Sequence, residues 1–298
     1  MNDADLHASK SDIIRELFMK TADQTYVVAR WCFLNRLYLD FYWNGLHAFE
    51  KYLKASLLFN DRSAISPTTK GKEYGHNIER LFAEVRKYAG PLIPKDLKKP
   101  SDLQISRWQP ESAAKFVERL NRLGDPNNRY NMFGFSQRPD DIYKFDRLVF
   151  EIRRVCINLE ADYFQRRKGA PAVKSNATIL SNSPSYQPNR LGSRLSVLTL
   201  DKATDEVKTA ALKHNLPFAA PDYDHGGLPS HSSADNPVLY RRIIVYAEQG
   251  TLTADDSLQV ATLADWTIAN IFLPADAKRE IADARDKLLQ SAKQSDGA

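Results

Sequence analysis

The sequence predicts an all-α protein, an up-down helical bundle followed by a helical C-terminal extension. Apolar residues recur at three- and four-residue spacing over most of the 298-residue chain, which is the pattern of amphipathic helices. Alternating runs bounded by hairpin turns, which would indicate strands, are absent, and no internal repeat has a fixed period. Residues that end helices, such as Gly90 and Pro91, stand where the periodic segments stop.

The first half of the chain contains five periodic segments. The helices predicted there span residues 13–31, 39–59, 76–89, 110–123 and 139–167. The second of them is apolar over most of its circumference, which is typical of a central helix with several neighbours. The connection over 91–110 holds four prolines and three lysines, and we expect it to be exposed.

The last helix of this half carries the most regular stripe in the chain. Its apolar positions are Ile142, Phe145, Val149, Ile152, Cys156, Leu159 and Tyr163, backed by Leu148, Phe150 and Val155. This is more apolar circumference than inward packing needs, and such a surface usually marks a partner face. We therefore predict a homodimer that pairs through this helix. The alternative is that the C-terminal helices, residues 260–272 especially, cover the face within one chain.

Composition changes beyond Lys168. Of the 25 residues over 169–193, 13 are Gly, Pro, Ser or Asn, which indicates a linker. The predicted domains are therefore a bundle over residues 1–168, a linker over 169–193 and a helical region over 194–298. Helices of that last region are predicted near 200–214, 237–249, 254–272 and 275–291.

The net charge of +5 is unevenly distributed. Lys and Arg exceed Asp and Glu by 7 through Lys168, whereas acids exceed bases by 2 beyond it. A basic excess on one part of a chain favours a phosphate-bearing partner, although it also serves solubility. The chain has no apolar run of membrane-spanning length and no signal-peptide pattern, and we expect Cys32 and Cys156 to be buried free thiols. These features predict a cytoplasmic protein without a membrane partner.

Three segments together resemble the HEPN superfamily. The run Ala48-Phe-Glu-Lys-Tyr-Leu-Lys-Ala-Ser-Leu is similar to the signature of that family's second helix. Tyr74-Gly-His-Asn-Ile-Glu-Arg-Leu resembles the start of its next helix, and Asn128-Arg-Tyr-Asn resembles its Arg-Tyr turn. The resemblance covers about residues 10–167. It implies an up-down bundle, usually dimeric, that acts on RNA or nucleotides.

The resemblance also raises the question of ribonuclease activity. Many HEPN members are metal-independent ribonucleases in which four to six residues separate an Arg from a following His on the last long helix. In this chain Arg153 and Asn158 have that spacing, but Asn stands in place of His and cannot titrate near neutrality. We therefore predict an RNA- or nucleotide-binding protein. One alternative is a ribonuclease with a degenerate site, using Arg153 or Arg154 with Asn158 or His47. The other is a protein that binds a nucleotidyltransferase in a toxin–antitoxin-like pair.

The candidate binding residues are basic or aromatic. On the predicted last helix Arg147, Arg154 and Asn158 share one side with Glu151, which indicates a phosphate-facing stripe or a solvated face with an ion pair. Arg129 and Tyr130 can stack and grip a base, or they can pin a loop to the bundle. The exposed connection adds Lys95, Lys98 and Lys99.

The sequence predicts neither a metal site nor a cofactor. Asp222, Asp224, His225, His231 and Asp235 crowd into one loop, but their spacing follows no metal-binding signature. A half-buried, hydrogen-bonded side chain is favoured for His47 over a catalytic one. His76 stands at a family position that caps and orients the third helix. No phosphate-binding glycine loop, paired-cysteine motif or nucleophile elbow is present.

Overall fold

A computed structural model describes residues 3–67, 73–101, 103–162, 174–183, 203–220, 222–271 and 273–295. These residues are mostly helical, as predicted, and their named strands are only two or three residues long. None of the described helices is both long enough and apolar enough to span a membrane. The chain forms two compact units. Unit 1 comprises the described residues within Met1–Asp125 and Gln137–Ser232, and unit 2 those within Pro126–Ser136 and Ser233–Ala298.

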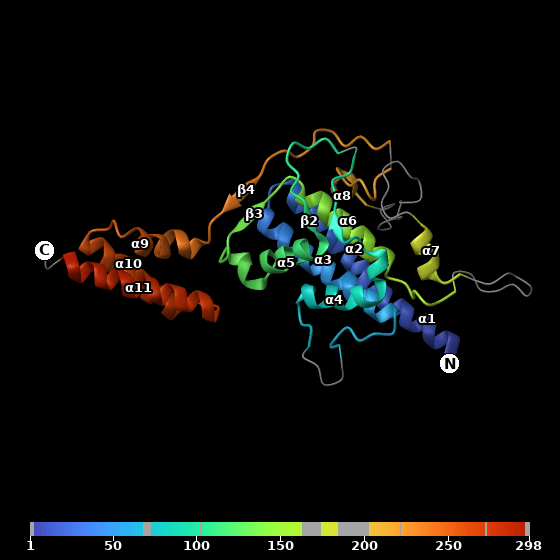
Figure 1. The fold of residues 1–298 in the computed structure, drawn as a ribbon, viewed down its shortest axis with the longest axis horizontal. Coiled ribbons are helices and arrows are strands. Elements are labelled where there is room, and N and C mark those ends of the chain that lie inside the picture. The colour runs from blue at the N-terminus through green and yellow to red at the C-terminus, as the bar shows by residue number, and fades with distance from the viewer. Residues whose placement is uncertain are drawn as a thin grey trace, which may run out of the picture. The chain divides into compact units, whose positions relative to one another are not determined.

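Unit 1 begins with one continuous helical stretch made of α1 (Asp3–Ile14), a π-helical turn η1 (Arg15–Met19) and α2 (Lys20–Leu34). Helix α3 (Tyr38–Phe59) lies along α2 (Figure 1). As its apolar circumference predicted, α3 is buried on most sides. The thiols Cys32 and Cys156 are free and buried, as predicted, and burial raises the pKa of Cys32 to about 11.

The shorter helices of unit 1 begin two to three residues later than predicted, and Glu111 lies in a strand and not in a first helical turn. Helix α4 (Ile78–Ala89) is capped by Asn77, whose side chain accepts a hydrogen bond from the Arg80 amide at 3.0 Å, and it continues into the 3₁₀ turn η2 (Gly90–Leu92). The connection that follows is held by an antiparallel pair, β1 (Asp96–Leu97) with β2 (Glu111–Ser112). Helix α5 (Ala113–Leu123) then begins at Ser112, which caps the Lys115 amide.

Helix α6 (Asp141–Arg154) is much shorter than the predicted helix over 139–167. Beyond Arg154 the chain leaves the helix because other groups take its hydrogen bonds. Asn60, at the end of α3, donates to the Ile157 carbonyl and accepts from the Leu159 amide, both at 2.9 Å. Leu159 is still buried, so its apolar spacing reflects burial of an irregular segment and not a helix. Residues 163–167 lie outside the described part.

The described residues of the apolar stripe of α6 are buried, so the stripe does not need a second copy to cover it, and the homodimer stays a prediction. Phe145 is fully buried and contacts Tyr26 of α2 and Phe41 of α3. Phe150 contacts Phe218 at 5.6 Å between ring centroids. These aromatic partners of α6 all belong to unit 1, whereas residues 260–272 belong to unit 2. Tyr163 lies outside the described residues.

Three buried clusters, each of one tyrosine, one aspartate and one arginine, join the helices of unit 1. In each cluster the tyrosine hydroxyl donates to the carboxylate and the guanidinium pairs with the same carboxylate. The clusters are Tyr26–Asp146–Arg30, Tyr52–Asp23–Arg153 and Tyr42–Asp141–Arg119. A buried carboxylate needs such partners because it has lost its hydration. Since α6 supplies one member of every cluster, these contacts fix α6 against α2, α3 and α5.

The segments after α6 are divided differently from the predicted domains. Helix α7 (Asn176–Asn182) falls within the predicted linker, whose residues 169–173 and 184–193 lie outside the described part. Helix α8 (Asp205–Leu212) packs on α2, where Arg30 donates to the Ala210 carbonyl at 2.9 Å. Residues 203–232 therefore belong to unit 1, although the sequence grouped them with the C-terminal helices.

Unit 2 contains the remaining helices. It comprises the 3₁₀ turn η3 (Pro126–Tyr130), the first two residues of strand β3 (Phe135–Gln137), its partner β4 (Ser233–Asp235), the π-helical η6 (Tyr240–Ile244), α9 (Val245–Gln249), α10 (Ala254–Asn270) and α11 (Ala275–Ser295). Helices α10 and α11 lie side by side (Figure 1), close to their predicted ranges. Their core includes Ile243, Ala264 and Ile281.

Candidate functional site

A basic cleft lies beside α6, where the connection over 94–98 passes it. The cleft has a volume of ≈ 320 Å³. Its lining residues are Pro94, Lys95, Asp96, Leu97, Lys98 and Arg147. Three cations therefore face one carboxylate in this cleft, and all three cations were candidate binding residues. The basic cleft defined by these six residues is the candidate functional site.

A smaller hollow of ≈ 20 Å³ adjoins the basic cleft and shares Leu97, Lys98 and Arg147 with it. Its further lining residues include Trp108 and Tyr143, and we call it the aromatic pocket. The Tyr143 hydroxyl is buried and has no hydrogen-bond partner among the described residues. Burial raises the pKa of Tyr143, so this hydroxyl stays protonated and can donate. The sequence analysis missed both aromatic residues, because neither lies in a recognisable motif.

The fold presents two of the lysines to solvent. The Ala113 amide donates to the Lys95 carbonyl at 2.9 Å, and β1 pairs with β2, so the backbone here is anchored. The ammonium groups of Lys95 and Lys98 are exposed and have no partner among the residues that the structure describes. Lys99, by contrast, donates to the Ile105 carbonyl at 3.0 Å and is used within the connection itself.

The two arginines predicted on α6 share one buried carboxylate. Glu151 is fully buried, with Oε1 at 2.9 Å from Arg147 Nε and Oε2 at 3.0 Å from Arg154 Nη1. The Arg147 side chain is 24% exposed and lines the basic cleft. Arg154 is 11% exposed, donates to the Leu180 carbonyl and lines a different cleft. Arg147 is therefore the arginine of α6 that the fold offers to a ligand at the basic cleft.

An ion-pair network lies under the aromatic pocket. Lys144 is fully buried, with Nζ at 3.0 Å from Glu111 Oε2 and 2.9 Å from Asp140 Oδ2, and it lies 5.4 Å from the Trp108 ring centroid. Burial by itself would raise the pKa of Glu111, but hydrogen bonds from Arg119 and Lys144 lower it. These contacts hold Lys144 beside the Trp108 ring and use its charge within the network, so Lys144 is not one of the cations offered to a ligand.

Two catalytic candidates, Arg153 and Asn158, are hydrogen-bonded to other residues of unit 1. Arg153 donates two hydrogen bonds to Asp23, at 2.8 and 2.9 Å, in one of the buried clusters. Burial by itself would lower the pKa of Arg153, but Asp23 raises it. Asn158 lies beyond the end of α6, where its side chain accepts from the Glu160 and Ala161 amides. The predicted stripe along one helix face therefore ends at Arg154 and does not include Asn158.

Arg129 and Tyr130 lie in η3 of unit 2, and neither lines the basic cleft. The Arg129 guanidinium is 4.7 Å from the centroid of the Tyr130 ring, which is itself exposed. The two side chains therefore contact each other. Their contact with a base stays a prediction.

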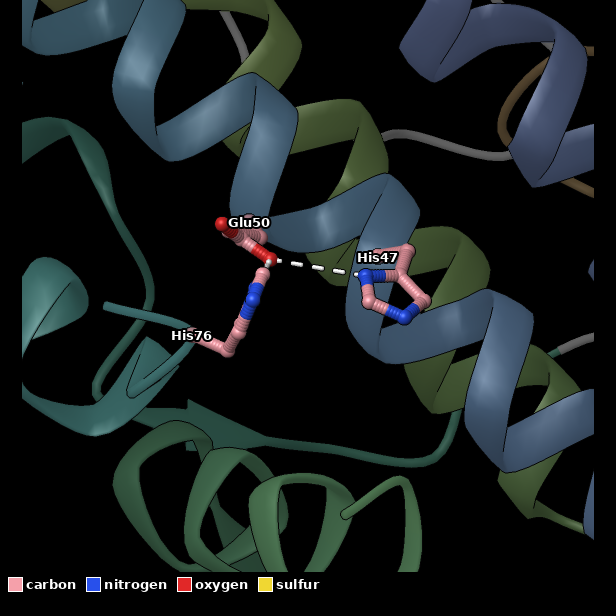
Figure 2. A group of neighbouring side chains, drawn as sticks. All are labelled: His47, Glu50 and His76. Carbon is pink, nitrogen blue, oxygen red and sulfur yellow. Dashed lines mark hydrogen bonds and ion pairs between the residues drawn. The ribbon is translucent and has the colours of Figure 1, made fainter. Parts of the chain in front are cut away.

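A second polar cluster combines His47, Glu50 and His76. His47 and Glu50 are three residues apart on α3, and His76 lies in the turn before α4 (Figure 2). One possible ligand atom from each residue lies within 4.8 Å of the others. Among the described residues, no other group of three or more histidine, cysteine or carboxylate side chains has its ligand atoms this close together. The acidic and histidine residues of the loop over 222–235 therefore form no such group. The sequence missed the cluster because His76 is 26 positions from Glu50.

Comparisons with known proteins identify no relative of this chain. No protein-family model matches the chain, and no curated protein and no solved structure matches it either. The HEPN resemblance therefore stays a prediction, and function has to be argued from the chemistry of the two sites.

Proposed function

We propose that this chain is a HEPN-like protein that binds ribonucleotides, either free or in single-stranded RNA, at the basic cleft. One observation carries the proposal: Lys95, Lys98 and Arg147 line a single cleft next to Trp108 and Tyr143. The lysines and the arginine are about fifty residues apart in the chain, so their convergence depends on the fold.

The chemistry of the cleft suits the phosphate of a ribonucleotide. Lys95 and Lys98 supply two ammonium groups as point charges, and neither has a partner in the part of the chain that the structure describes. Arg147 supplies planar guanidinium donors that match phosphate oxygens, while Glu151 holds its position.

Trp108, beside the basic cleft, can contact a base there, whereas the aromatic pocket itself, at ≈ 20 Å³, holds no more than about one water-sized group. A tryptophan ring offers a flat face on which any base can stack, with about 1–3 kcal/mol per base. The cleft volume of ≈ 320 Å³ lies at the lower end of the range for small-molecule sites, which is roughly 300–1,000 Å³. This size favours one or two nucleotides over a duplex.

The contacts of the catalytic candidates favour binding over cleavage. Arg153 is paired with Asp23, and Asn158 has no titratable group. His47 contacts Trp43, Glu50 and His76, none of which belongs to the proposed nuclease set. The ribonuclease and the nucleotidyltransferase-binding alternatives remain predictions from the resemblance.

The salt dependence of binding tests the proposal. Fluorescence anisotropy would follow a labelled single-stranded oligoribonucleotide in one arm and a labelled mononucleotide in the other. Three cation–phosphate contacts give a slope of log K against log salt of about −2, so affinity falls roughly 20-fold between about 50 and 200 mM salt. A double variant, Lys95→Ala with Lys98→Ala, is expected to reduce the slope to about −0.7.

The control is the pair Lys87→Ala and Lys115→Ala, which removes two exposed lysines that do not line the cleft. This control should leave the slope unchanged. Binding in the oligonucleotide arm alone would assign the site to RNA, and binding in both arms would assign it to the nucleotide unit. The proposal is wrong if neither ligand binds saturably, or if the cleft variant and the control have the same slope.

A further inference from the structure

The cluster of His47, Glu50 and His76 has the composition of a transition-metal site. It offers two imidazole nitrogens and one carboxylate oxygen, which are the donors that Zn²⁺ and similar ions accept in proteins. The three side chains converge from two separate segments, α3 and the turn before α4 (Figure 2). None of the three lines the basic cleft, so the inference is independent of the proposed function.

The distances between the donor atoms are close to those of a tetrahedral site. Bonds of about 2.0–2.2 Å to a metal place the ligand atoms about 3.4 Å apart at tetrahedral angles. Glu50 Oε2 lies 3.5 Å from His47 Nδ1 and 3.0 Å from His76 Nδ1. The ligand atoms of the two histidines lie within 4.8 Å of each other, and exposed His76 can close the remaining gap by a small rotation.

Neighbouring side chains orient two of the three ligands in advance. Lys54 Nζ binds Glu50 Oε1 at 2.6 Å, which leaves Oε2 directed at both imidazoles. The edge of the Trp43 ring packs on His47, with 4.2 Å between the ring centroids. Partners of this kind fix the orientation of metal ligands.

We propose that His47, Glu50 and His76 bind one divalent transition-metal ion of the Zn²⁺ type. Glu50 is buried at the base of the site, and His76 is 64% exposed at its rim. Three protein ligands leave a fourth position for water, and that position faces the exposed side. The ion would join the turn before α4 to α3 and so stabilise this part of unit 1.

Titration of the full-length, tag-free protein with Co²⁺ and Zn²⁺ tests the proposal. Co²⁺ in a four-coordinate site gives visible absorption that reports coordination directly, and Zn²⁺ should displace it with a stoichiometry of one ion per chain. At a 100-fold excess of Zn²⁺ over its dissociation constant, the midpoint of thermal unfolding should rise by roughly 5–10 °C.

Two ligand variants and one control make the result specific. Loss of an outer partner of a metal ligand already costs about 10–100-fold in affinity, so His47→Ala and His76→Ala should each weaken binding by more than ~100-fold. His231→Ala is the control, because His231 contacts Arg36 and is outside the cluster. His76 is exposed, so its variant should fold normally, and circular dichroism without metal checks this.

The alternative is that His47, Glu50 and His76 form hydrogen bonds with one another and bind no metal ion. The proposal is overturned if Co²⁺ gives no saturable absorption in the unmodified protein. It is also overturned if the His76→Ala and His231→Ala variants bind the ion with the same affinity.

Discussion

Replacing Arg153 by alanine is expected to destabilise unit 1 by about 3 kcal/mol while leaving ribonucleotide binding unchanged. The side chains of Arg153 and Asp23 are 15% and 11% exposed, and two hydrogen bonds join them. The variant leaves the Asp23 carboxylate with the Tyr52 hydroxyl but without its cation. Removal of one partner of a buried ion pair costs about 3–5 kcal/mol, and the slight exposure here favours the lower value.

The loss can be measured in two ways. For a unit of this size, each kcal/mol shifts the unfolding midpoint by about 2–4 °C, so we expect a fall of roughly 6–12 °C in a calorimetric scan. Urea unfolding followed by circular dichroism gives the free energy itself. Asp23→Asn in the Arg153→Ala background should recover part of the loss, because no unpaired carboxylate remains.

The opposite pattern would refute this reasoning. If Arg153→Ala costs less than about 1 kcal/mol but abolishes ribonucleotide binding or an RNA cleavage activity, Arg153 acts on the ligand as the sequence analysis allowed. Arg147→Ala is the matched variant, because it should weaken binding while Glu151 keeps its contact with Arg154.

Two further outcomes follow from local geometry. A Cβ at Gly124 would lie 2.5 Å from the Tyr42 carbonyl oxygen, so Gly124→Ala should lower the free energy of unfolding in urea by about 1–3 kcal/mol. Gly90→Ala, where a Cβ meets nothing within 4 Å, should change it by less than about 0.5 kcal/mol, and equal effects would contradict the prediction. Burial, then the charge of Lys213 and that of His225, lower the pKa of His214 to about 4. Since the unfolded chain takes up that proton first as the pH falls below about 6.5, stability should drop by up to ~3 kcal/mol towards pH 4. His214→Asn should flatten that slope in urea unfolding series, and an unchanged slope would contradict the assignment.

The sequence predicts the helices wherever local signals and tertiary packing agree. The apolar circumference of residues 39–59 matched the burial of α3, and side-chain caps at Asn77 and Thr253 mark the starts of α4 and α10. The end of α6 was not predictable in this way. It depends on Asn60, which lies about a hundred positions away and replaces helical hydrogen bonds with its own.

The candidate site was predictable only in part. Lys95, Lys98 and Arg147 were identified because cations that are exposed or lie on a polar helix face can meet phosphate. The burial of Arg153 was not identifiable, because periodicity assigns a polar residue to solvent unless its partner is known. That partner, Asp23, is 130 positions away.

The two faces of α6 explain why the fold can keep a basic cleft. Its inward side supplies one member of each of the three tyrosine–aspartate–arginine clusters, so its position is fixed from three directions. Its outer edge carries Arg147, held by a carboxylate that is itself buried. A cation that is oriented before a ligand arrives loses less conformational entropy on binding. The charged residues of α6 that stabilise the fold therefore differ from Arg147, the residue of α6 that faces the ligand. Substitutions can test stability and ligand binding separately.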